Sequence, residues 1–215
     1  MKKVCTIVLW AICSHAFAQD SLKAYNNLRI KTTSSGMAVL GGWGLVNLAS
    51  GAYLNWGIGG KTVVITVDGN QVPSRVSSVS PELKYFAQMN TIWGSVNFVT
   101  ALLGYTGAQN DKNKHFSASQ LLEKQDRLQK IFLVNGCLDI GYVGAGLYLK
   151  LAGDSRNSAQ MKGYGESLLM QGGFLLIFDG LMYNAEKHNG NKLRNFLEKH
   201  PISFDGRRVG IIFQM

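Results

Sequence analysis

Charged residues are missing from long parts of this 215-residue chain, although the whole chain carries a formal net charge of +9. No Asp, Glu, Lys or Arg occurs from 32 to 60 or from 85 to 110. The segment 131–149 contains only Asp139, and the segment 167–185 contains only Asp179. A membrane span needs roughly 20 mostly apolar residues at a rise of about 1.5 Å each. All four segments reach this length, which predicts four transmembrane helices.

Cysteine is also scarce, and most of it lies in a segment that we expect to be removed. The first eighteen residues have the three regions of a secretory signal peptide. Two lysines precede an apolar stretch at 4–13, and the A-x-A sequence at 16–18 comes directly before Gln19. Cleavage there would leave Cys137 alone, which excludes an internal disulfide and a cysteine metal cluster. An uncleaved N-terminal anchor is the alternative.

These patterns predict an all-α membrane protein, an antiparallel four-helix transmembrane bundle with short hairpin-like extramembrane segments. Its parts are a signal peptide at 1–18, a polar leader at 19–33, a membrane domain at 34–184 and a basic extramembrane tail at 185–215. The spans are expected at about 34–59, 83–105, 131–152 and 163–184. The leader is either a short interfacial helix or disordered.

Short local motifs predict where several elements begin or turn. Asp-Gly pairs at 68–69 and 205–206, each between apolar runs, are typical of β-hairpins, although a flexible loop is the alternative for the first. Ser80 before Pro81 is typical of a helix N-terminus. Ser117 and Gln120 have the spacing of a capping box at the start of the helix that leads into the third span.

Polar side chains recur at helical spacing inside the predicted spans. Asn135, Asp139 and Tyr142 fall at i, i+4 and i+7 and so share one stripe. Gln171 and Asp179 are eight apart and also share a face. A charge at that depth costs a few kcal/mol at least and is tolerated where it faces protein or water. The stripe of the third span therefore requires partner helices with polar faces.

We expect these polar groups to gather in one half of the membrane. At about 1.5 Å per residue, polar groups from all four spans come out at similar depths. Asp139 and Asp179 should lie within about 10 Å of each other on neighbouring antiparallel helices. The predicted intramembrane polar cluster consists of Asp139, Asp179, Asn135, Asn97, Asn47 and Gln171.

This cluster is consistent with three functions. In a non-enzymatic scaffold or interaction protein of the cell envelope, the polar groups hold the helices in register, at about 0.5–2 kcal/mol per contact. In a small transporter or proton-coupled protein, Asp139 and Asp179 form a proton or ion site. An intramembrane aspartyl hydrolase is a remote third hypothesis, because two carboxylates at one depth could share a proton. We favour the scaffold, since no broken helix or basic partner interrupts the core.

Other chemistry is absent from the sequence. The histidines beyond residue 18 have no metal-ligand spacing, and no P-loop, dinucleotide fingerprint or G-x-S-x-G is present. We therefore expect no catalytic residues, no cofactor, no metal and no nucleic acid. The expected partners are the lipid bilayer, an envelope protein or a second copy of the chain, and anionic lipid at the basic tail.

Two signals disagree about orientation. Most Lys and Arg lie in the leader, the second loop and the tail, on the side of the mature N-terminus. The positive-inside rule assigns that side to the cytoplasm. A cleaved signal peptide assigns it to the exterior, and we follow the signal peptide.

Four motifs resemble a known family. They are GMAVLGGWGLVN at 36–47, YFAQMNTIW at 85–93, NGCLDIGYVGAGLYL at 135–149 and GYGESLLMQGGFLLIFD at 163–179. Together they resemble a bacterial domain-of-unknown-function family of small, exported, four-span membrane proteins. The first loop is longer than in that family. The resemblance implies the four-span architecture and carries over no activity, ligand or catalytic residue.

Overall fold

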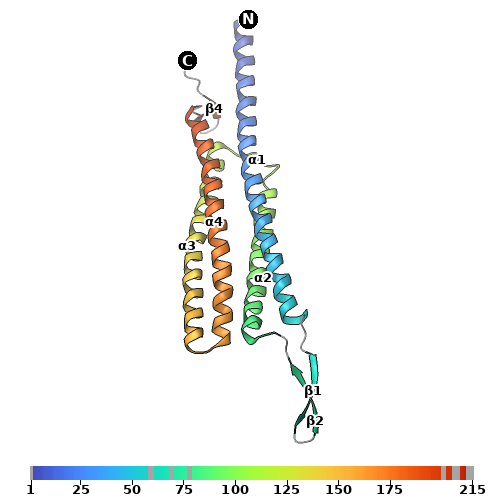
Figure 1. Ribbon diagram of the computed structural model, residues 1–215. Helices are drawn as coiled ribbons and strands as arrows, with labels where there is room; N and C mark the ends of the chain where they lie inside the picture. Colours follow the sequence, from blue (N-terminus) through green and yellow to red (C-terminus); the bar gives the residue numbers. More distant parts are fainter. Residues whose placement is uncertain are drawn as a thin grey trace. The chain divides into compact units, whose positions relative to one another are not determined.

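The structure is a computed structural model that describes residues 2–57, 61–67, 70–76, 79–199, 202–204 and 209–211. Its side chains are described for 20–55, 70–71 and 79–199. Four long helices dominate this part of the chain, as Figure 1 shows. They are α1 (Lys2–Ala52), α2 (Pro81–Gln109), α3 (Ala118–Ser155) and α4 (Ala159–Lys199), and a π-helical turn, η1 (Tyr53–Gly57), follows α1. The chain is therefore mainly α-helical, as its sequence predicts.

Three helices are long and apolar enough to cross a membrane: Asp20–Asn55, Ala118–Ser155 and Ala159–Lys199. The fourth, α2, has 29 residues, which is sufficient length. It is not among the three helices above because its polar side chains lower its average hydropathy. The helices α2, α3 and α4 extend beyond both ends of their predicted spans. The helix α1 begins before the predicted first span of 34–59 but ends at Ala52, where η1 follows, and residues 58 and 59 lie outside the described residues. The leader at 19–33 belongs to α1, and the first half of the tail belongs to α4, because no proline interrupts the helix in either segment.

The helix ends follow local side-chain chemistry. The Ser80 hydroxyl accepts a hydrogen bond from the Leu83 amide at 3.2 Å, one residue before Pro81 begins α2. At the start of α3, the Gln120 amide donates to the Ser117 hydroxyl at 3.3 Å, and the Ser117 amide donates to Gln120 Oε1 at 3.0 Å. These reciprocal bonds confirm the predicted capping box. Between α3 and α4, Asn157 adopts a φ of 48°, which lets the chain reverse in a few residues.

Two antiparallel hairpins complete the described elements. Strands β1 (Lys61–Val67) and β2 (Asn70–Val76) pair in a register that sets Val67 opposite Asn70, on either side of the predicted Asp-Gly turn. Strands β3 (Ile202–Phe204) and β4 (Val209–Ile211) pair in the tail. Both hairpins occur where the sequence predicts them, because the Asp-Gly pairs lie between strand-forming runs.

The chain divides into two compact units. Unit 1 consists of Met1–Gly36, Gly104–Leu133 and Gly180–Met215, and unit 2 consists of Met37–Leu103 and Val134–Asp179. Each long helix contributes to both. Unit 2 contains most of the predicted membrane domain, whereas unit 1 contains the leader, the segment between α2 and α3, and the end of α4.

Glycines bring the helices of unit 2 into close approach. A Cβ atom on Gly44 would lie 2.9 Å from the Gly94 carbonyl oxygen, and one on Gly94 would lie 2.8 Å from the Gly44 carbonyl oxygen. Gly51 of α1 meets the earlier α2 residue Ala87, so the α1 and α2 segments run antiparallel. The α3 and α4 segments are also antiparallel, and their backbones approach each other closely where Gly146 lies against Gly165. Small residues allow this backbone proximity between helices.

The burial pattern is inverted relative to a water-soluble protein. Among the described side chains, 15 polar or charged residues are buried against 12 hydrophobic ones. At the same time, 22 large hydrophobic side chains are exposed, with Leu103, Ile177 and Leu181 each at least 66% exposed. A water-soluble monomer rarely exposes so many large apolar side chains. An apolar exterior around a polar interior is what a bilayer requires.

Candidate functional site

The centre of unit 2 is the side chain of Gln171 in α4, which is completely buried. Its Nε2 donates to Asn47 Oδ1 at 2.7 Å and to Asn90 Oδ1 at 3.2 Å. Its Oε1 accepts from Trp43 Nε1 at 2.8 Å and from Asn97 Nδ2 at 3.3 Å. A carboxamide has two donors and two acceptor lone pairs. Gln171 therefore uses its full hydrogen-bonding capacity and joins α1, α2 and α4.

The partners of Gln171 are held in place in turn. The hydroxyl of Ser167, one turn earlier in α4, donates to Asn90 Oδ1 at 2.6 Å. Asn47 Nδ2 donates to the Trp43 carbonyl oxygen at 2.8 Å. The Trp43 ring stacks on Phe174, with ring centroids 4.1 Å apart and planes within 9°. We call these residues, Trp43, Asn47, Asn90, Asn97, Ser167 and Gln171, the amide network.

A second polar feature of unit 2 is a pair of carboxyl groups. Asp139 of α3 and Asp179 of α4 are 2% and 4% exposed, and their carboxyl groups interact with each other. Asp139 Oδ2 is buried without a hydrogen-bond partner among the described residues. No ion pair of the described chain supplies either carboxyl with a cation. Unlike the amide network, this pair keeps unused hydrogen-bonding capacity.

The structure thus separates the predicted cluster into two features. Asn47, Asn97 and Gln171 join through hydrogen bonds, and Asp139 and Asp179 join as a pair. Gln171 and Asp179 are eight residues apart in α4, about 12 Å along the helix. Among the described residues, the hydrogen bonds of the amide network do not extend to the carboxyl pair.

Asn135 does not belong to either group as the structure places it. Its side chain is half-buried, and none of the hydrogen bonds described for unit 2 includes it. It lies one turn from Asp139 on the same helix, which is why its spacing suggested membership. Helical spacing identifies a shared stripe but does not tell whether a neighbouring side chain reaches each member of it.

Three members of the amide network were absent from the predicted site: Trp43, Asn90 and Ser167. Asn90 lies seven residues before Asn97, a spacing that places both on one face of α2. That repeat was a usable signal. Trp43 and Ser167 gave a weaker signal of the same kind, since each lies four residues before a predicted member, Asn47 and Gln171 respectively. An indole in an apolar helix and a serine near a glycine are also common features of helix packing in membranes.

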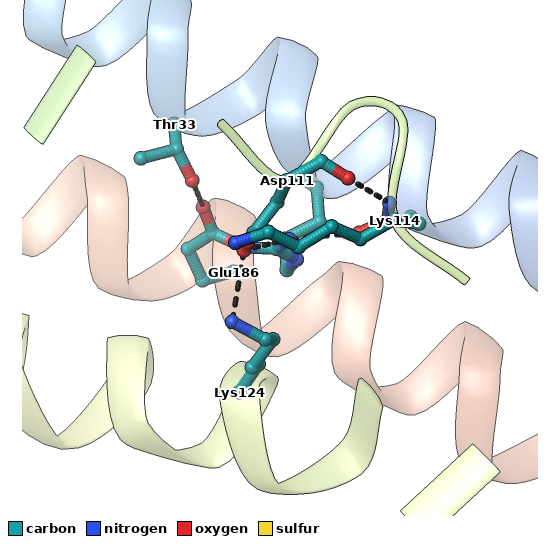
Figure 2. A network of polar contacts seen from close by, with 7 residues as sticks. Thr33, Asp111, Lys114, Lys124 and Glu186 are labelled. Atoms are coloured by element: carbon teal, nitrogen blue, oxygen red, sulfur yellow. Dashed lines mark hydrogen bonds and ion pairs between the residues drawn. The ribbon is translucent and has the colours of Figure 1, made fainter. Parts of the chain in front are cut away.

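Unit 1 contains a buried ionic cluster around Asp111, which the sequence did not predict (Figure 2). Its Oδ2 accepts from Arg29 of α1 and from Lys124 of α3, both at 2.9 Å, and its Oδ1 pairs with Lys114 at 3.2 Å. Burial alone would raise the pKa of Asp111. Hydrogen bonds from Lys124, Lys114 and Arg29 outweigh burial and hold its pKa below the usual value.

Glu186 of α4 is the other buried acid of unit 1 and is completely enclosed. Thr33 donates to its Oε1 at 2.9 Å, as Figure 2 shows, and Gln125 donates to its Oε2 at 2.7 Å. Gln125 also donates to the Glu186 carbonyl oxygen at 2.6 Å. These bonds tie α1 and α3 to α4 within unit 1. Both acids are therefore occupied by structural partners.

Metal chemistry has no support in the part of the chain that the structure describes. No group of three or more His, Cys, Asp or Glu side chains there could hold a metal ion. Cys137 is a free, exposed cysteine. What unit 2 does offer is an amide network centred on Gln171, whose hydrogen-bonding capacity is fully used, and a carboxyl pair that could exchange a proton.

Comparison with protein-family models finds a match. A model described as a family of unknown function (DUF6992) matches residues 39–180, which include the amide network and the carboxyl pair. Comparison with curated proteins and with solved structures found no match. The matched range is nearly that of the predicted membrane domain, so the part of the chain that the family model recognises is the part predicted to span the membrane.

Proposed function

We propose that this chain, which belongs to the family of unknown function described above, is a non-enzymatic scaffold or interaction protein in the membrane of the bacterial cell envelope. The family description assigns no activity, so the proposal depends on the residues themselves. We propose further that the fold is an antiparallel bundle of four transmembrane helices. The amide network and the exposed apolar surface of unit 2 support it.

Two observations favour α2 as the fourth span. Its polar side chains Asn90 and Asn97 turn inward to Gln171 and Ser167. Its large apolar side chains, including Val96, Val99 and Leu103, are at least 50% exposed. An average over the helix mixes these two faces and underestimates the hydrophobicity of the outer one. A helix with this arrangement suits a bilayer when its polar face is covered by other helices.

The saturation of Gln171 carries the scaffold proposal. A group that binds a substrate or moves an ion needs capacity that the resting protein leaves open. The amide of Gln171 has none, since each of its four hydrogen-bonding positions is in use. Satisfied buried networks rigidify a core and specify one arrangement of helices. Unit 2 is accordingly built to hold a shape that a partner in the envelope would recognise.

Copurification tests this proposal. The tagged full-length chain is extracted from its native membranes in mild detergent and analysed by mass spectrometry, with Gln171→Ala as the variant and Gln160→Ala, an exposed change on the same helix, as the control. A scaffold should retain a defined envelope protein or a second copy of itself, and Gln171→Ala should lose it. A protein that purifies without any stoichiometric partner would contradict the proposal.

The carboxyl pair favours one second candidate, a small proton-coupled membrane protein. Asp139 and Asp179 interact directly, and Asp139 Oδ2 is buried without a hydrogen-bond partner. Ionisable groups at such positions are frequent in proton pathways. Reconstitution into vesicles with a trapped pH-sensitive dye distinguishes the two functions. Proton flux that depends on Asp139 would favour the second candidate over the scaffold.

A further inference from the structure

Unit 1 contains a cavity of about 240 Å³ whose wall is basic. Lys23 comes from α1, and Lys112, Lys114 and His115 come from the segment between α2 and α3. All four side chains are exposed, so their polar ends are accessible at the cavity. Phe116 lines the same cavity and supplies an apolar surface.

The positive charge of this cavity is not balanced by the chain. Among the described ion pairs, none includes Lys23 or Lys112. The nearest buried carboxylate, Asp111, is already shared by Arg29, Lys114 and Lys124. One carboxylate facing three cations leaves an excess of positive charge even before Lys23 and Lys112 are counted. An anion from outside the chain would find two lysines free of internal competition.

The cavity is also held in shape. Asn26 Nδ2 donates to the Asp111 carbonyl oxygen at 3.1 Å, and Arg29 donates to both Asn26 Oδ1 and Asp111 Oδ2. The segment that carries Lys112 and Lys114 is therefore held against α1 at Asp111, near its beginning. The Lys124 ammonium lies 4.7 Å from the centre of the Phe116 ring, which fixes the other end of the segment. Such preorganisation lowers the entropic cost of binding a ligand.

We propose that this cavity binds a phosphate-bearing anion, either a phosphate ester free in solution or the phosphodiester headgroup of an anionic lipid. Lysine is a common phosphate ligand, and several lysines around one cavity suit a charge that is spread over oxygens. The volume lies below the roughly 300–1,000 Å³ of pockets for drug-sized ligands, which fits a headgroup or a small ester. Asn26 lies eight residues before the predicted first span, about 12 Å along the helix, so either source can reach the cavity.

This site is independent of the scaffold and of the carboxyl pair, because all of its residues belong to unit 1. Its test uses the full chain in a neutral detergent. The probes are inorganic phosphate, glycerol 3-phosphate and short-chain phosphatidylglycerol, with short-chain phosphatidylcholine as a zwitterionic comparison. The variants are two single substitutions, Lys23→Gln and Lys112→Gln. The matched control is Lys192→Gln, which changes an exposed lysine of unit 1 outside the cavity.

Calorimetric titration should show binding of at least one phosphate probe to the wild type, weakened about five-fold by each lysine substitution in the cavity. Lys192→Gln should bind as the wild type does, and Lys112→Arg should retain binding. Equal binding of free phosphate esters and of lipid identifies a soluble ligand, whereas binding of phosphatidylglycerol alone identifies a headgroup. Absence of binding to all three phosphate probes, or equal losses in Lys192→Gln, would overturn the proposal. Thermal unfolding checks that the variants remain folded.

Discussion

Gln171 Nε2 of α4 donates to Asn47 Oδ1 of α1 at 2.7 Å, across 124 positions of the sequence. The bond is one of four that a single carboxamide makes in the interior of unit 2. Inside a membrane the hydrophobic effect does not drive helices together, so packing and interhelical hydrogen bonds must do so. Gln171 is accordingly the residue whose loss should affect the helix arrangement most.

Gln171→Ala should destabilise the protein by about 2–3 kcal/mol, since it removes four interhelical bonds that average roughly 0.6 kcal/mol each in membranes. It also leaves Asn90 and Asn47 with buried oxygens that lose a donor. Thermal unfolding in detergent measures the change. Gln160→Ala on the exposed face of α4 should stay within about 0.5 kcal/mol of the wild type. Equal effects of the two substitutions would show that the network does not stabilise the fold.

Gly44→Ala should be destabilising by about 1–3 kcal/mol, because its Cβ would lie 2.7 Å from the Phe98 amide nitrogen. Backbone atoms cannot move aside without separating α1 from α2. Gly42→Ala, two residues earlier, has no atom within 4 Å of the new Cβ and should be neutral or stabilising by up to about 1 kcal/mol. Unfolding of both variants under one condition tests the pair. A neutral Gly44→Ala would rule out the close approach of the two helices.

Asp111 should make the stability of unit 1 sensitive to acid. Its pKa is held below the usual value, so its carboxylate stabilises the folded state above the unfolded pKa of about 3.9. That contribution is lost as pH falls from there through the folded pKa, because protonation breaks the ion pairs. The melting temperature of the wild type should therefore fall in this window, whereas that of Asp111→Asn should change less.

Asp111→Asn should itself be about 3 kcal/mol less stable at neutral pH, because it removes the ion-pair partner of the 7%-exposed Arg29 side chain. Asp154→Asn is the matched control, since Asp154 is exposed and pairs with Lys162. It should retain the acid sensitivity of the wild type. Parallel pH profiles for Asp111→Asn and the wild type would refute the assignment.

The sequence was sufficient for features that depend on neighbouring residues. The capping box of Ser117 and Gln120 and the two Asp-Gly hairpins each require a few adjacent positions. The apolar stretches likewise indicated long helices, because the absence of charge over twenty residues is itself a local property. The described structure contains these features where they were expected.

Features that join distant segments were less accessible. Gln171 was recognised as an inward polar residue, but its bond to Trp43 depends on which face of α1 packs against α4. Asp111 lies in a polar segment that looks like an ordinary loop, and its partner Arg29 is 82 positions away. Asn135 shares a stripe with Asp139 and yet reaches neither polar feature. Spacing along one helix does not specify the neighbour opposite each residue.

Processing of the N-terminus is a separate prediction from the sequence. The mature protein should begin at Gln19, after the A-x-A sequence at 16–18. Intact-mass measurement of the protein from native membranes checks this. Ala18→Leu should block cleavage, because the site requires small residues, and should add the mass of residues 1–18 to the product. A wild-type protein that retains residues 1–18 would instead establish the uncleaved anchor.

Asp139→Asn separates the two candidate functions most directly. Asparagine preserves the size of the side chain, can donate a hydrogen bond to Asp179, and removes the need to accommodate two acids at one buried position. Under the scaffold proposal, stability should stay within about 1 kcal/mol of the wild type or rise, and the copurified partner should be retained. Under the proton-coupled alternative, the same folded variant should lose proton flux in vesicles. A double-mutant cycle with Asp179→Asn adds a measure of coupling, and additivity within about 0.3 kcal/mol would show that the two carboxyl groups do not act as a pair.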